Sequence, residues 1–470
     1  MMGEQEKQPK LFYPHLNLEQ RIPKTHLLRK IHEQIDFQFI YGEVKDTYGQ
    51  NGNISIPPPV ILKMMLLLVL YNVRSERELM ETIPLRLDWL WFLGYDLDGE
   101  VPDHSVLSKA RKRWGEEAFR RFFERIVWQC VEAGLVDGSK LFIDSSLVEA
   151  DASNNSVIDT RSLKGQLEAN YNELEARLEE SSERRGVKEN KRYLSTTDPD
   201  ATIVNRGKAD LAYQVHRAVD GRTEVITATE TTPGDINEAH EMIPLLEDHR
   251  DNTGINAETV VADSKYGTIQ NYLDCHDRGI EAHIPDLREL AAERDIYPEE
   301  RFDYDRDSDT YLCPAGNRLK PKSLHLRRQS RDYAAPRKTC AECSLREQCT
   351  RNKSGRTVKR HLRQDELDRM REGSRSARSK EDIKTRQHLM ERSFARGTRY
   401  GFDRARWRRL WRVRIQQYLI SAVQNIHVLI RYGSSRKRSP AIVMERIGEG
   451  LRNRRFFLDR FYCQRSFIKI

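Results

Sequence analysis

The sequence predicts an α+β fold, in which a helical N-terminal domain precedes a mixed-sheet (α/β) domain. Up to about residue 135 the apolar residues recur at helical spacing, whereas from residue 140 onward they alternate as in strands. The 470 residues also exceed what one hydrophobic core usually serves. We therefore expect two or more domains.

The N-terminal part is expected to be helical throughout. Pro57-Pro58-Pro59 ends a Gly/Asn-rich loop and starts the helix VILKMMLLLVLYN, and SERELMETI follows. The next helix begins at Ser105, and the turn Asp137-Gly138 closes the region. Basic residues near its start fit a DNA-facing surface and, equally well, the solvated flank of a helical bundle: Lys109, Arg111, Lys112 and Arg113.

Strands are expected after this point. The run LFIDSSLVEA surrounds Asp144, and AYQVHRAVDGRTEVITATETTPGD reads as two strands about the turn Asp220-Gly221. The run AETVVADS is a further strand that leads into Asp263, followed by the helix GTIQNYLDCHDRG and the short strand EAHIPD. Between the first two strands, residues 155–198 are expected to form a helical insertion, since Leu163, Leu167, Leu174 and Leu178 share one helical face.

Three acidic residues stand in settings that suggest one metal site. Asp144 and Asp263 belong to apolar strand segments, and Glu391 lies in the basic helical stretch HLMERSFARGTRYGFDRARWRRLW. A buried carboxylate is costly unless something pairs it, and a divalent cation can pair several. Three carboxylates are hard oxygen ligands, which favours two Mg²⁺ or Mn²⁺ ions over zinc. Glu149 and Asp151 are nearby competitors for the role of Asp144.

The positive charge is concentrated in one segment. Residues 351–415 hold 22 Lys+Arg and 8 Asp+Glu, a net of +14, so the rest of the chain carries −6 of the total of +8. A local concentration of positive charge is typical of a phosphate-binding surface. The alternative is that the arginines are merely solvated on a helix whose Trp407 and Trp411 pack inward. The arginines expected to contact double-stranded DNA are Arg386, Arg399, Arg404, Arg406, Arg408, Arg409, Arg412 and Arg414.

Four of the seven cysteines form a second constellation in YLCPAG and KTCAECSLREQC, namely Cys313, Cys340, Cys343 and Cys349. The gap between Cys340 and Cys343 suits two thiolates on one zinc. A structural Zn²⁺, free buried thiols and a redox pair all remain open. Cys130, Cys275 and Cys463 are expected to be ordinary core residues, and His216 and His240 to be structural rather than part of the acidic site.

Short motifs follow one another in order along nearly the whole chain. They are PPPVILKMMLLLVLY, Ser75-Glu76-Arg77, DWLWFLGYDLDGEVPDHSVLSKARKR, IDSSLVEADAS, STTDPDA, AYQVHRAVD, TTPGD, VADSKYG, CPAG, CAEC and ERSFARGTRYGFDRARWRRLWRVRIQQYLISAVQNIHVLI. Together they resemble an insertion-sequence transposase of the DDE type, in the branch with a helical N-terminal transposase domain and a cysteine-bearing insertion. The resemblance implies a ribonuclease H-like catalytic domain with Asp144, Asp263 and Glu391 as the metal-binding catalytic triad.

The resemblance also implies the domain organisation and the partners. The expected parts are a helical N-terminal domain (1–135), the first part of the catalytic core (136–290), the cysteine-bearing insertion (291–375), the closing helices with Glu391 (376–435) and a basic C-terminal tail (436–470). The partners are the terminal repeats of a mobile element and target DNA. Because two element ends must meet, a homodimer is expected in the DNA complex.

The sequence departs from the family pattern around Glu391. Relatives carry a lysine seven residues beyond the glutamate, where this chain has Thr398 beside Arg399. Lys384 and Gln387 replace a tyrosine and an arginine, with Arg386 next to the latter. A catalytically decayed or regulatory DNA-binding descendant, and a metal-dependent nuclease without strand transfer, are therefore kept as alternatives.

The location is expected to be the bacterial cytoplasm, in association with the nucleoid. The N-terminus lacks the apolar core of a signal peptide, and the strongest apolar run, residues 64–71, is too short to span a membrane. An odd number of cysteines without a secretion signal also favours a reducing compartment.

Overall fold

The computed structural model describes residue 2 and residues 17–49, 54–159, 193–205, 209–286 and 296–433. The chain divides into two compact units, one of residues 1–259 and 385–470 and the other of residues 260–384. The N-terminal helices and the first strands therefore belong to the same unit, whereas the sequence suggested a boundary at residue 135. The expected helix within 160–192, the tail 436–470 and Cys463 lie outside the described residues.

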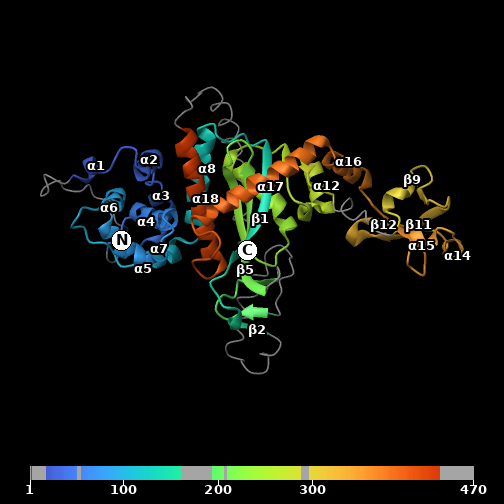
Figure 1. Cartoon of the computed structure of the whole chain (residues 1–470), viewed down its shortest axis with the longest axis horizontal. Helices are drawn as coiled ribbons and strands as arrows, with labels where there is room; N and C mark the ends of the chain where they lie inside the picture. The colour runs from blue at the N-terminus through green and yellow to red at the C-terminus, as the bar shows by residue number, and fades with distance from the viewer. Residues whose placement is uncertain are drawn as a thin grey trace, which may run out of the picture. The chain divides into compact units, whose positions relative to one another are not determined.

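The predicted helical N-terminal region is confirmed (Figure 1). Its helices are α1 (Leu18–Arg21), α2 (Leu27–Gln34), α3 (Ile40–Val44), α4 (Pro58–Leu70), α5 (Glu76–Thr82), α6 (Leu87–Leu93), α7 (Ser105–Trp114) and α8 (Glu117–Glu132). α4 is buried along its whole length, as its apolar run predicts. The helical stretch that begins at Ser105 is divided, because Gly115 takes φ +69° and ends α7 before α8 begins.

The first unit contains an antiparallel sheet with β5 in the middle. Its described strands are β1 (Lys140–Glu149), β4 (Thr202–Asn205), β5 (Ala209–Asp220) and β6 (Ile226–Pro233). β1 pairs with β5 along one edge, and β4 and β6 pair with different parts of the other edge. The predicted turn Asp220-Gly221 is confirmed. A separate two-stranded hairpin of β2 (Val157–Asp159) and β3 (Tyr193–Ser195) carries the described ends of the first insertion.

β5 is buried on both faces from Ala212 to Asp220. α11 (Met242–Thr253) packs on β5 and β6, and α18 (Leu410–Tyr432) packs on β6 and along α8. The carboxylate of Asp220 accepts hydrogen bonds from the backbone N–H groups of Gly138 (2.8 Å) and Asp137 (3.1 Å). The two turns that the sequence predicts are therefore tied to each other.

Polar side chains of α18 fasten the elements around it. Asn425, which is fully buried, accepts from the backbone N–H of Ile226 and donates to its carbonyl, both at 2.8 Å. Gln424 donates to the carbonyl of Ser393 at 2.8 Å. Gln416 donates to the carbonyls of Gly401 (2.8 Å) and Arg404 (2.9 Å). One helix thus holds β6, a second helix and a loop in register.

The STTDPDA motif caps the start of α18. Asp198 accepts from the backbone N–H of Arg409 and Asp200 from that of Leu410, both at 2.9 Å. Carboxylates at a helix N-terminus satisfy unpaired N–H groups and favour the positive end of the helix dipole. Asp198 is fully buried, and burial raises its pKa. The motif therefore has a structural role.

The second unit has two parts of its own. α12 (Ile269–Asp277) and α16 (Gln364–Ser374) pack together, and α16 also packs on β8 (Glu281–His283), which pairs with β7 (Thr259–Val261). The other part is a sheet in the order β13-β12-β11-β10-β9. Its strands are β9 (Asp303–Asp305), β10 (Thr310–Leu312), β11 (Arg318–His325), β12 (Ser330–Ala334) and β13 (Thr357–His361).

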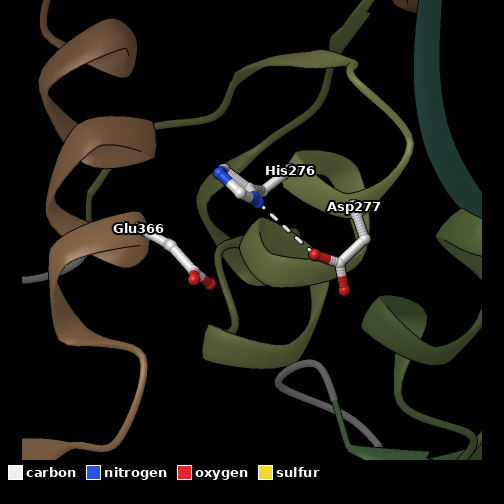
Figure 2. Close-up of side chains that lie close together, drawn as sticks. All are labelled: His276, Asp277 and Glu366. Carbon is white, nitrogen blue, oxygen red and sulfur yellow. Dashed lines mark hydrogen bonds and ion pairs between the residues drawn. The ribbon is translucent and has the colours of Figure 1, made fainter.

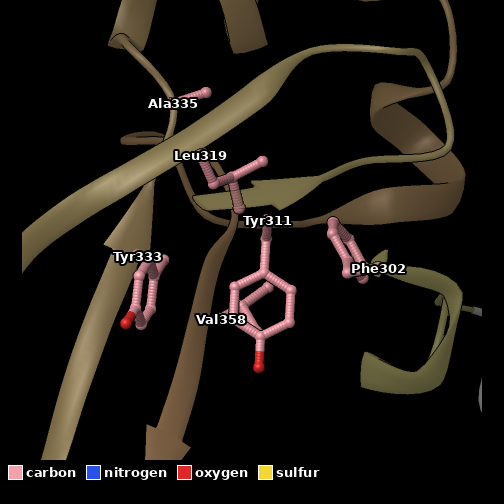
Figure 3. Packing of buried hydrophobic residues seen from close by; sticks show 6 residues of the cluster. All are labelled: Phe302, Tyr311, Leu319, Tyr333, Ala335 and Val358. Carbon is pink, nitrogen blue, oxygen red and sulfur yellow. The ribbon is translucent and has the colours of Figure 1, made fainter. Parts of the chain in front are cut away.

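The cysteine-bearing part of the second unit has a small core of its own. Figure 3 shows the side chains that form it, namely Phe302, Tyr311, Leu319, Tyr333, Ala335 and Val358. The short helices α14 (Arg337–Ala341) and α15 (Arg346–Cys349) connect β12 to β13. Cys313, Cys340 and Cys349 pack against this core.

α17 (Ala377–Thr398) begins in the second unit and ends in the first, and it carries Glu391 in a helix as predicted. The 3-10 turns are Lys45–Thr47, Ile83–Leu85, Asn154–Ser156, Glu238–Glu241, Ser264–Tyr266, Glu299–Arg301 and Leu326–Arg328. None of the helices in the described part of the chain is long and apolar enough to cross a membrane.

Replacement of Asn425 by alanine is expected to lower stability by roughly 2–4 kcal/mol, because the buried N–H and C=O of Ile226 would both lose their partner. Thermal unfolding of the full chain measures the effect. Arg431→Ala, at an exposed position near the end of the same helix, is the control. A melting temperature equal to that of the control would show that the two hydrogen bonds contribute little.

Candidate active site

Asp144 lies inside β1, directly after the buried residues Leu141, Phe142 and Ile143. β1 continues to Glu149 because it pairs with β5 along its length. The Asp144 side chain is 23% exposed, and its Oδ1 accepts from the backbone N–H of Ser145 at 2.8 Å. A rigid strand therefore presents this carboxylate.

A second carboxylate, which the sequence analysis missed, lies beside Asp144. Glu238 is in the 3-10 turn that follows β6, is 6% exposed, and has a carboxylate oxygen within 4.8 Å of one of Asp144. The sequence feature that could have pointed to Glu238 is its position three residues after the TTPGD motif. That feature is weak, since Asp235 belongs to the motif itself and Glu241 also follows it.

Arg386 of α17 forms an ion pair with Asp144. Its Nη1 lies 2.5 Å from Oδ2 of Asp144, and the arginine side chain is only 13% exposed. Two carboxylates brought close together repel each other, and a cation between them removes that cost. The guanidinium of Arg386 therefore occupies the kind of position that a metal ion would take next to Asp144.

Glu391 follows Arg386 by five residues on α17, about 7.5 Å along the helix axis. It is exposed, and its Oε1 accepts from Nε2 of Gln387 at 3.2 Å. In the described part of the chain, Glu391 belongs to no group of three metal-ligating side chains whose ligand atoms lie within 4.8 Å of one another. Its carboxylate therefore faces solvent in this state.

Asp263 belongs to the second unit, whereas Asp144, Glu238 and Glu391 belong to the first. It lies two residues after β7 and is half-buried. Its Oδ1 accepts from the backbone N–H of Lys265 at 3.0 Å, so the side chain caps a 3-10 turn. The predicted place at the end of a strand is thus observed for this aspartate.

Two basic residues of β5 lie in the core. Arg217, the register partner of Asp144, is fully buried, and its Nη1 donates to the carbonyl of Ser393 at 3.2 Å. Burial lowers the pKa of Arg217 to about 9. Burial also lowers the pKa of His216 to about 4, and Nε2 of that ring lies 2.9 Å from Oγ1 of Thr232. His216 is therefore a neutral core residue, and His240 is exposed.

Several of the predicted DNA-contacting arginines are on the surface. Arg399 is exposed, and Arg412 lies with its guanidinium 4.8 Å from the ring centre of Trp411. The side chains of Arg404 and Arg408 are 63% and 51% exposed, and both face Asp151, at 3.7 Å and 3.3 Å. These two arginines line a polar groove together with Glu149 and Asp151.

Arg406 and Arg414 differ from the expectation, because the interior of the protein engages their guanidinium groups. Arg414 is 7% exposed and pairs with Glu230 (2.7 Å) and Glu116 (3.3 Å). Arg406 donates to Asn72 and to the carbonyl of Val73, and burial lowers its pKa. A phosphate could reach neither group without disrupting these contacts.

Trp407, which lies between the arginines, and the backbone of this segment also have structural roles. Trp407 donates from Nε1 to Glu76 at 3.1 Å, and the guanidinium of Arg111 lies 4.0 Å from its ring centre. Arg409 takes φ +82° at the N-cap of α18, a left-handed conformation that only glycine adopts without strain. The 404–411 segment is therefore fixed to the N-terminal helices.

The four predicted cysteines of the insertion are half-buried free thiols that line one cavity of the second unit. Cys130 and Cys275 are buried core residues as expected, and burial raises the pKa of each to about 12. No three of the four cavity sulfurs lie within 4.8 Å of one another.

A separate acidic cluster of the second unit is already neutralised by the protein. Figure 2 shows His276 and Asp277 of α12 facing Glu366 of α16. Arg363 pairs with both carboxylates, and its hydrogen bond is the main cause that lowers the pKa of Asp277 to about 2. Arg363 therefore supplies the positive charge that compensates these two carboxylates.

Two family models match the chain. Residues 16–113 match a transposase domain (DUF772), which covers α1 to α7. Residues 312–430 match a transposase DDE domain, which covers the cysteines, α17 with Glu391 and most of α18. Asp144 and Asp263 lie outside both matched ranges. No curated protein sequence matches the chain.

One solved structure is similar in outline, the piggyBac transposase synaptic complex with hairpin DNA. The identity is 8%, the match covers 91% of this chain and 78% of that chain, and the TM-score is 0.37. A likeness this loose does not bear on fold or function.

Replacement of Arg386 by glutamine is expected to increase Mn²⁺ affinity about tenfold, because the metal would no longer compete with a charge-assisted hydrogen bond worth about 1.5 kcal/mol. Titration of the DNA-free protein with Mn²⁺, followed by electron paramagnetic resonance of the free ion, measures it. Arg392→Gln, on an exposed face of the same helix, is the matched control. Unchanged or weaker binding in Arg386→Gln would contradict the competition.

Proposed function

This chain is a DDE-type transposase, and we propose that it binds the ends of a mobile DNA element, cleaves phosphodiester bonds there and joins the freed 3′-hydroxyl ends to target DNA. The observation that carries the proposal is the close pair of Asp144 and Glu238 in the first unit, opposite the Arg386 side chain. We assign the catalytic roles to Asp144, Asp263 and Glu391, with Glu238 as an additional acidic residue.

The residues fit the divalent metals that such chemistry uses. Asp144 and Glu238 offer hard oxygen ligands in a partly buried setting, and Arg386 pairs with Asp144. Two Mg²⁺ or Mn²⁺ ions, when bound, would activate the attacking oxygen and stabilise the leaving oxygen of the phosphodiester. Asp144, Asp263 and Glu391 are the side chains that would hold them.

The protein residues position this chemistry. β1 fixes Asp144, while Arg217 and Gln424 both donate to the carbonyl of Ser393 and so anchor α17 two residues beyond Glu391. The Glu391 side chain itself is exposed, so it is free to turn toward a metal. If Asp144 served as a metal ligand, the guanidinium of Arg386 would be available to contact a phosphate of the DNA backbone.

Double-stranded DNA is the proposed partner. The exposed arginines Arg399, Arg404 and Arg408 supply charge for backbone phosphates, with Arg409 and Arg412 beside them. We exclude Arg406 and Arg414, whose groups are engaged internally. A homodimer would bring two element ends together, and DNA binding of this kind would place the protein with the nucleoid of a bacterial cytoplasm.

Asp144→Asn, Asp263→Asn and Glu391→Gln are each expected to reduce cleavage at least about 100-fold, because loss of even an outer partner of a metal site costs 10–100-fold. The assay follows cleavage and joining of labelled DNA that carries the element ends, with Mg²⁺. Glu238→Gln is expected to reduce cleavage less than the other three. Full cleavage by any triad variant would remove that residue from the triad.

The controls separate chemistry from binding and folding. Glu381→Gln changes an exposed acid on the same helix as Glu391 and should leave cleavage unchanged. DNA affinity measured by fluorescence anisotropy should be retained in all triad variants. Cleavage without joined product in the unaltered protein would indicate a nuclease without strand transfer. Binding without cleavage would indicate a decayed or regulatory descendant.

A further inference from the structure

We propose that Cys313, Cys340, Cys343 and Cys349 bind one structural zinc ion in the second unit. This site is independent of the carboxylates that carry the proposed transposase chemistry. Four thiols converge on one cavity, and both the backbone around them and the charges that line the cavity suit a metal ion.

The four thiols converge from separate segments. Cys313 follows β10, Cys340 lies in α14, Cys343 follows that helix, and Cys349 ends α15. All four line the same cavity, next to Phe302 and Leu319 of the small core. Four thiolates on a shared cavity are the ligand set of a closed, tetrahedral structural zinc site.

The backbone lies close to two of the four sulfurs. The backbone N–H of Asn317 donates to Sγ of Cys313 at 3.3 Å, in a tight turn whose Gly316 takes φ +76°. Gly355 takes φ +95°, and a Cβ atom at this position would lie 2.9 Å from Sγ of Cys340. Only glycine therefore allows this approach to the sulfur.

The charges that line the cavity complement a four-thiolate site. Zinc with four thiolates carries a net charge of minus two. Arg346 donates to the carbonyl of Cys340 at 3.3 Å, and Arg356 donates to that of Cys349 at 3.5 Å. Nε of Arg356 is buried and has no hydrogen-bond partner. Two cations thus line the cavity, and the unpaired Nε–H of Arg356 is a hydrogen-bond donor there.

A zinc ion would also supply what this part of the chain lacks. Its hydrophobic cluster consists of six residues under short strands, and so small a core is usually supported by a disulfide or a metal. The thiols are free and only half-buried, unlike Cys130 and Cys275. Because the sulfurs are more widely spaced than in a zinc site, zinc binding would draw α14 and α15 toward the turn after β10.

The test is the metal content and the cobalt spectrum of the full chain. The protein purified with zinc in the medium is expected to hold one zinc per chain by mass spectrometry. After exchange with Co²⁺ it should show thiolate-to-cobalt charge transfer and the intense visible bands of tetrahedral coordination. A cobalt spectrum without thiolate bands, or no bound zinc, would overturn the proposal without requiring any variant to fold.

Variants locate the site. Cys340→Ser with Cys343→Ser should lose the zinc, whereas Cys275→Ala, which removes a buried thiol of the same unit, should retain it. The measurement is repeated in Asp144→Asn with Glu391→Gln, which removes carboxylates of the proposed active site. Zinc kept by the double cysteine variant, or lost with the carboxylates alone, would contradict the assignment. Either result is separate from the cleavage assay.

Discussion

The buried amide side chains of α18 are the constraint on which the rest of the first unit depends. A buried amide is costly unless its donors and acceptors are paired, so each one fixes its partner in place. Asn425 fixes the start of β6, Gln424 fixes α17 at Ser393, and Gln416 fixes the loop at Gly401 and Arg404. The sheet that presents Asp144 and the helix that presents Glu391 are thereby held by one common element.

A second constraint on the structure is that the negative charges of its carboxylates must be compensated. Several buried or crowded carboxylates have an identifiable hydrogen-bond or ion-pair partner. The backbone N–H of Arg409 and the hydroxyl of Tyr213 donate to Asp198, and Arg386 pairs with Asp144. Arg363 forms ion pairs with both Asp277 and Glu366. This cluster therefore does not require a metal ion to balance its charge. Carboxylate oxygens of Asp144 and Glu238 lie close together, and a divalent cation at their position would offset the repulsion between them.

The basic segment shows why the number of basic residues in a sequence does not by itself define a DNA-binding surface. The arginines between residues 404 and 414 look alike in the sequence. Arg404 and Arg408 remain exposed, whereas Arg414 is an internal ion-pair partner of Glu230 and Glu116. Arg406 and Trp407 join the segment to Asn72 and Glu76 of the N-terminal helices. Part of the positive charge therefore serves folding.

The sequence alone determined the order of helices and strands, the turn at Asp220-Gly221, the helix of Glu391 and the strand positions of Asp144 and Asp263, because these follow from local periodicity and turn chemistry. Its ordered motifs also predicted a resemblance to DDE transposases, and two transposase family models match residues 16–113 and 312–430. Only the tertiary structure decided that Glu238 and Arg386 flank Asp144 and that Arg414 is buried. Those facts depend on contacts between residues far apart in the chain, for which local spacing carries no information.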